Sequence, residues 1–124
     1  MLNETLGWFL ILAGMLGGAA LGLGFQDDDW MGGHGAYRRR ILRLGHVALL
    51  ALGFLNILFV HCLERLQLPQ PLLSLAGWGL GIGAVSMPAC CALMAWTRRA
   101  QPLFAVPVTS LVGGVALVAC GLLP

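Results

Sequence analysis

Three polar side chains interrupt a long apolar run of the chain, and they are the residues there that could do chemistry. His46, Asn56 and His61 lie within residues 41–62. An imidazole or an amide at membrane depth is costly, so such a residue is by default paired or functional. At about 100° per residue, His46 and Asn56 share one arc of a helix. The spacing predicts that both face protein and form interhelical hydrogen bonds.

An imidazole inside a membrane is also a haem ligand, so b-type haem at His46 is an alternative interpretation. Bis-histidine ligation takes one histidine from each of two helices at matching depth. His61 lies on the same run, about 22 Å further along a helix, so a second copy of the chain would have to supply the partner of His46. The protein would then be a haem- or quinone-linked electron-transfer subunit, with His46 and His61 as the cofactor-binding residues.

The remaining reactive groups do not form a catalytic or metal-binding pattern. The cysteines, Cys62, Cys90, Cys91 and Cys120, contain no C-x-x-C motif and no metal-ligand spacing. Cys62 and Cys120 end their apolar runs on the same predicted side, which leaves a disulfide and two unpaired thiols both open. The five acidic residues lie outside the apolar runs or at their ends, so no carboxylate relay is expected. No nucleophile has an evident base, and an enzyme is not expected.

The composition places these residues in a membrane. Of 124 residues, 59% are hydrophobic and only 10% are charged, whereas a soluble domain has about a quarter of its residues charged. This balance excludes a soluble domain and a disordered chain. It also removes the basis for a nucleic-acid partner.

Four apolar runs are long enough to cross a bilayer: residues 6–24, 41–62, 72–96 and 103–123. The basic residues are all arginine, and six of the seven adjoin the first and third connections. The positive-inside rule therefore places residues 25–40 and 97–102 in the cytoplasm and both termini outside. The predicted fold is an all-α integral membrane protein, a single four-transmembrane-helix bundle over residues 1–124 in the bacterial inner membrane.

Small residues predict how these runs pack, because lipid gives helices no hydrophobic reason to associate and close approach must supply the contact energy. Glycine makes up 18 of the 124 residues. The predicted packing residues, in chain order, are Gly14, Gly18, Gly22, Gly53, Asn56, Gly77, Gly81, Ala84, Ser110 and Gly114. The third run is small on two sides and is predicted to lie centrally. The side of the second run with Ala48 and Phe59 is predicted to face lipid.

The arginines beside the second run predict a contact with the membrane surface. Arg38, Arg39, Arg40 and Arg43 form a juxtamembrane cluster of the kind that anchors to anionic lipid headgroups. Membrane lipids are therefore expected partners of the chain.

The leading functional hypothesis is a non-catalytic membrane protein that acts through helix–helix contacts. It would be an accessory subunit of a larger membrane complex or a homo-oligomer, and it would need no cofactor. The electron-transfer subunit with haem b is the first alternative. The second is a small-solute channel or transporter lined by His46, Asn56, Ser86 and Thr109.

Overall fold

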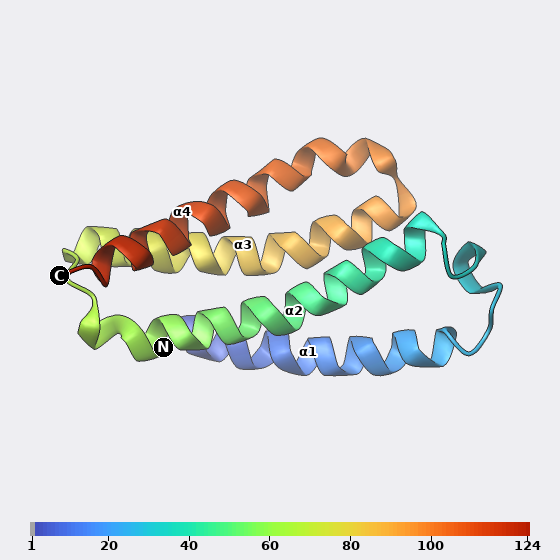
Figure 1. Cartoon of the computed structure of the whole chain (residues 1–124), viewed down its shortest axis with the longest axis horizontal. Coiled ribbons are helices and arrows are strands. Elements are labelled where there is room, and N and C mark those ends of the chain that lie inside the picture. Colours follow the sequence, from blue (N-terminus) through green and yellow to red (C-terminus); the bar gives the residue numbers. More distant parts are fainter. Residues whose placement is uncertain (1) are drawn as a thin grey trace.

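The computed structural model describes residues 2–124, and every element in that range is helical. Four long helices form the body of the molecule (Figure 1): α1 (Leu2–Gly24), α2 (Tyr37–Cys62), α3 (Gln70–Trp96) and α4 (Ala105–Gly121). Three short 3-10 turns lie between them: η1 (Trp30–Gly32), η2 (Leu63–Arg65) and η3 (Arg98–Phe104). Four helical segments are long and apolar enough to cross a membrane, which confirms the predicted all-α class with four such helices.

The helix starts differ from the predicted spans. α1 begins at Leu2, and α2 begins at Tyr37, so that Arg38, Arg39 and Arg40 are helical instead of lying in a loop. Nothing between Tyr37 and Arg40 breaks a helix, and a charged residue can continue a helix beyond its apolar part. α4 begins at Ala105 and carries Pro107 in its first turn, where the missing N–H of proline leaves no hydrogen bond unmade.

The helices follow one another side by side in chain order. α1 packs on α2, α2 on α3, and α3 on α4, while α1 has only a limited contact with α3. α1 and α4 are therefore the edges of an open row (Figure 1). The two termini lie at one end of this row, and the α1–α2 and α3–α4 connections lie at the other.

Both central helices use two sides. On α3, Gly77 faces Phe59 of α2, whereas Gly79 faces the Ser110 carbonyl of α4. On α2, the side predicted to face lipid is partly wrong, because Ala48 is 7% exposed and Phe59 is 6% exposed. The physical reason is the row itself: a helix with a neighbour on each side must bury two faces.

Two buried clusters hold α2 and α3 together, one near each end of their contact. The cluster near the termini consists of Phe59, Leu66, Ala76 and Leu80. The cluster near the arginine-rich end consists of Ile41, Cys91, Met94, Ala95 and Ala100. At this second cluster α2 approaches α3 closely, since a Cβ at Gly45 would lie 3.0 Å from the Cβ of Cys91.

The segment between α1 and α2 turns sharply through three residues with positive φ. They are Met31 (φ 56°), Gly32 (φ 92°) and Gly33 (φ 91°). Glycine adopts this conformation without steric cost, but Met31 is strained there. The turn brings the start of α2 back over the end of α1.

Candidate functional site

A network of two amides joins three helices at the end of the molecule that carries the termini. Asn56 of α2 is completely buried. Its Oδ1 accepts a hydrogen bond from Nδ2 of Asn3 at 2.8 Å, and Asn3 Nδ2 also donates to the Gly77 carbonyl of α3 at 2.8 Å. Asn56 Nδ2 donates to the carbonyls of Leu52 at 2.8 Å and Leu80 at 3.4 Å. Asn56 therefore links α1, α2 and α3.

Asn3 was not among the residues singled out from the sequence. It lies three positions ahead of the run predicted to start at residue 6. The available signal was an uncharged amide beside one apolar run, together with a second amide, Asn56, inside another run.

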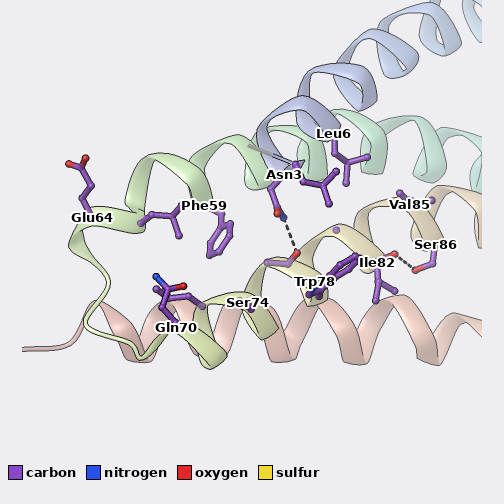
Figure 2. A pocket seen from close by; sticks show the side chains of 15 residues that line it. Asn3, Leu6, Phe59, Glu64, Gln70, Ser74, Trp78, Ile82, Val85 and Ser86 are labelled. Atoms are coloured by element: carbon purple, nitrogen blue, oxygen red, sulfur yellow. Dashed lines mark hydrogen bonds between the residues drawn. The ribbon is translucent and has the colours of Figure 1, made fainter.

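A side groove of about 860 Å³ runs along α3 beside this network (Figure 2). Leu2 and Leu6 of α1 form one wall, and Trp78 and Ile82 of α3 form part of the other. The groove is open because residues 77 and 81 of α3 are glycines, which have no side chain to fill it. A Cβ at Gly81 would lie 3.6 Å from Leu6, which is an ordinary contact distance. Its volume is in the range of small-molecule sites.

Most of the polar side chains of the groove lie at one end. Glu64, Gln70 and Ser74 line it near the α2–α3 connection, whereas most of the other lining side chains are apolar. Further along, Ser86 Oγ donates to the Ile82 carbonyl of its own helix at 2.7 Å. The groove thus offers a long apolar surface with hydrogen-bonding groups concentrated at one end.

The two histidines of α2 do not converge. The ring of His46 lies against α1, where a Cβ at Gly18 would be 2.5 Å from its Cε1. His46 Nδ1 is buried and has no hydrogen-bond partner among residues 2–124. His61 is exposed, with Nδ1 3.0 Å from the Ile57 carbonyl. Haem ligation by His46 stays a prediction that needs a second chain.

The cysteines and acidic residues do not form a site in the part of the chain that is described. All four cysteines are free thiols. Cys62 belongs to α2 and Cys120 to α4, two helices that are separated by α3. Residues 2–124 contain no group of three or more His, Cys, Asp or Glu side chains that could hold a metal ion.

The residues proposed to line a channel do not all line the side groove. Ser86 lines the side groove, but His46, Asn56 and Thr109 do not. Thr109 is exposed on α4, where its Oγ1 donates to the Ala105 carbonyl at 2.8 Å.

Several predicted packing glycines lie at close helix contacts. Gly14 and Gly18 of α1 face Leu50 and His46 of α2, and Gly114 of α4 faces Leu80 of α3. The backbones of α1 and α2 also approach each other closely, since a Cβ at Gly53 would lie 2.8 Å from the Gly7 carbonyl oxygen. Ala84 is completely buried in α3. Gly22 differs, because no described atom lies within 4 Å of the Cβ position.

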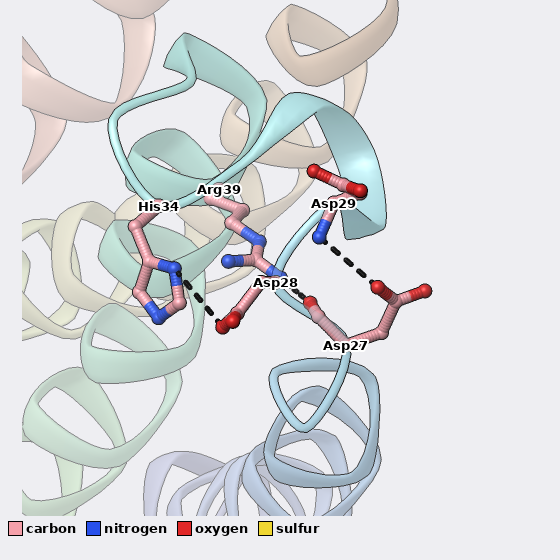
Figure 3. A network of polar contacts seen from close by, with 5 residues as sticks. All are labelled: Asp27, Asp28, Asp29, His34 and Arg39. Atoms are coloured by element: carbon pink, nitrogen blue, oxygen red, sulfur yellow. Dashed lines mark hydrogen bonds and ion pairs between the residues drawn. The ribbon is translucent and has the colours of Figure 1, made fainter.

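The arginine cluster divides into one buried and three exposed residues. Arg39 is only 1% exposed, so the prediction that it anchors to lipid headgroups is wrong. Its guanidinium lies 5.1 Å from the ring centre of Phe25 and 5.7 Å from that of Trp30, and Nη2 donates to the Asp27 carbonyl (Figure 3). Arg39 therefore holds the α1–α2 connection in place. Arg38, Arg40 and Arg43 remain exposed.

Figure 3 also shows the carboxylates of this connection. His34 Nδ1 lies 3.8 Å from Asp28 Oδ1, and both side chains are largely exposed. The backbone N–H of Asp29 donates to Asp27 Oδ1 at 3.0 Å. These contacts are those of a solvated turn.

Comparisons with protein-family models, with curated proteins and with solved structures find no match to this chain.

Proposed function

We propose that the chain is an integral membrane protein that acts through helix–helix contacts, either as a subunit of a larger membrane assembly or as a homo-oligomer. The proposal rests on one observation, the uncovered face of the edge helix α4. α4 buries Pro107, Gly114 and Gly121, and its other side carries no neighbour from the row.

That uncovered side is lined by small residues. We call it the α4 outer face: Ala105, Thr109, Gly113, Ala116 and Cys120, all of which are exposed. Consecutive members are three or four positions apart, so they follow one side of the helix. A Cβ at Gly113 would meet no described atom within 4 Å. Such a surface suits a second helix at short distance, which is how helices associate in lipid.

The proposed orientation follows from charge. Arg38, Arg39, Arg40, Arg43, Arg98 and Arg99 flank the two connections at the end of the row opposite the termini. The positive-inside rule puts that end in the cytoplasm. We therefore propose both termini outside, in the inner membrane of a bacterial cell.

Two alanines on α4 give a matched test. Ala116→Leu adds three carbons to the α4 outer face, whereas Ala119→Leu adds the same group to an exposed position roughly 80° around the helix from the centre of that face. We expect Ala116→Leu to weaken association in bilayers at least about tenfold, which is about 1.4 kcal/mol. Ala119→Leu should change it less than about threefold. Energy transfer between labelled copies, and thiol crosslinking at Cys120 in native membranes, provide the measurements.

A wild-type chain that stays monomeric in bilayers and forms no crosslinked adduct at Cys120 would contradict the proposal. Equal weakening by both leucine variants would also contradict it, because association would not depend on the α4 outer face. An adduct twice the mass of the chain indicates a homo-oligomer, and another mass indicates a different subunit.

A further inference from the structure

A second cavity, of about 460 Å³, opens at the arginine-rich end of the molecule. We call it the arginine pocket. It lies between the start of α2 and the end of α3, and the side chains that matter for its chemistry are Tyr37, Arg38, Trp96 and Arg98. Met31 and Ala36 close it on the side of the α1–α2 connection. None of these groups belongs to the side groove or to the α4 outer face.

The arginine pocket carries two positive charges without a negative partner. Arg38 and Arg98 both line it, and both are exposed. Within residues 2–124 the one ion pair joins His34 to Asp28, so neither arginine is neutralised by a carboxylate. No acidic residue is among those that line the pocket in the described part of the chain. The lining of the pocket is therefore positively charged, which favours an anion.

The start of α2 lies at the same place. Ala36 is the residue that precedes the first turn of α2, and it provides no side-chain hydrogen bond to that turn. The first N–H groups of a helix have no partner within the helix, and they favour a negative charge nearby. Ala36, Tyr37 and Arg38 all line the pocket. The start of α2 thus points to the same class of ligand as the two arginines.

The geometry of the aromatic side chains suits a membrane interface. The Arg98 guanidinium lies 4.5 Å from the ring centre of Tyr37, so this arginine is held over an aromatic face. Trp96 is 65% exposed at the last position of α3. Tryptophan and tyrosine concentrate at the headgroup level of a bilayer.

We propose that the arginine pocket binds a phosphate group, with Arg38 and Arg98 as its cationic ligands and the start of α2 as a further donor. Guanidinium groups match the charge and the oxygen geometry of phosphate. In the proposed orientation the pocket opens at the cytoplasmic leaflet, where basic pockets between helices bind anionic headgroups. An anionic phospholipid is therefore the expected source, and free phosphate is the other source of the same chemistry.

The test uses the full chain in a neutral detergent and a matched pair of double variants. Arg38→Gln with Arg98→Gln removes both charges of the pocket. Arg40→Gln with Arg99→Gln removes two neighbouring exposed charges that do not line it. Phosphatidylglycerol, phosphatidylcholine and inorganic phosphate are the three probes, and lipid retention in native mass spectrometry and competition by phosphate are the readouts.

We expect phosphatidylglycerol to be retained by the wild type at least about tenfold more tightly than phosphatidylcholine, or about 1.4 kcal/mol. The pocket variant should lose this preference, and the control variant should keep it within about threefold. Saturation by inorganic phosphate without retention of phosphatidylglycerol would support the phosphate site and assign it to free phosphate. Equal losses in the two double variants would overturn the proposal, since diffuse surface charge would explain the binding. Equal retention of the two lipids, with no competition by phosphate, would also overturn it.

This site is independent of the proposed helix contact. Ala116→Leu changes α4 only and should leave the binding of phosphatidylglycerol unchanged. A chain that binds phosphatidylglycerol but never associates would retain the phosphate site and lose the proposed function. Circular dichroism of the two arginine double variants checks that both retain the helical fold.

Discussion

Asn56 shows how the protein itself satisfies a completely buried amide. Its carbonyl oxygen takes a hydrogen bond from Asn3, and its amide nitrogen reaches two backbone carbonyls. An amide without these partners would carry a desolvation cost of about 1–3 kcal/mol. The network therefore explains why a polar side chain is tolerated at this position, and it fixes the start of α1 against both α2 and α3.

The coupling between the two amides is measurable. A double-mutant cycle with Asn3→Ala and Asn56→Ala isolates the hydrogen bond from the other effects of each truncation. Interhelical hydrogen bonds in membrane proteins average about 0.6 kcal/mol, so we expect a coupling of roughly 0.5–1.5 kcal/mol. The measurement is the free energy of unfolding by a denaturing detergent. Additive effects of the two truncations would show that the Asn3–Asn56 contact adds nothing to stability.

At the scale of the elements, the glycines of α3 differ in what lies against them. Some face the backbone of a neighbouring helix, and others face a side chain. A Cβ at Gly79 would lie 2.9 Å from the Ser110 carbonyl oxygen of α4, a fixed atom that cannot turn aside. A Cβ at Gly81, two positions along, would meet Leu6 at an ordinary 3.6 Å. The same substitution is therefore expected to act in opposite directions at these two positions.

We predict that Gly79→Ala destabilises the protein by about 1–3 kcal/mol, because α4 must move away from α3. Gly81→Ala should stabilise it by up to about 1 kcal/mol, since alanine favours a helix over glycine and has room here. Unfolding in a denaturing detergent measures both values against the wild type. If the two variants had the same stability, the close contact of α3 with α4 at Gly79 would be incorrect.

The sequence predicted the two-sided packing of α3 because its small residues follow two clear helical stripes. The burial of Ala48 and Phe59 on α2 was missed for the opposite reason. Both are apolar, and an apolar side chain suits lipid as well as protein, so the pattern of α2 does not separate its two environments. The burial of Arg39 could not be predicted either. It stands between two other arginines in the sequence, and only the folding of the α1–α2 connection over it distinguishes it from the exposed Arg38 and Arg40.

At the scale of the whole molecule, the open row determines which surfaces remain for partners. A closed arrangement would have joined α1 to α4, and the α4 outer face would then have been covered. The row instead leaves each edge helix with a free side. The alternating direction of the helices brings the arginines beside two distant connections to one end. The arginine pocket depends on this alternation, since Arg38 lies at the start of α2 and Arg98 lies in η3.

The orientation of the row is the last prediction. In a chain with all four cysteines replaced by alanine, Gln67→Cys places one thiol in the α2–α3 connection, and Gly35→Cys places one in the α1–α2 connection. Both positions are exposed, and a Cβ at Gly35 would meet no described atom within 4 Å. The excess of arginine at the connection that contains Gly35 predicts a cytoplasmic location for it.

A membrane-impermeant maleimide should therefore label Gln67→Cys in intact cells, and it should label Gly35→Cys only after the membrane is permeabilised. The two variants control for each other, because they differ in position and not in chemistry. The reverse pattern would mean that the arginine pocket opens at the outer leaflet. Labelling of both positions in intact cells would mean that the chain inserts in both orientations, and the six arginines at one end would then not decide its topology.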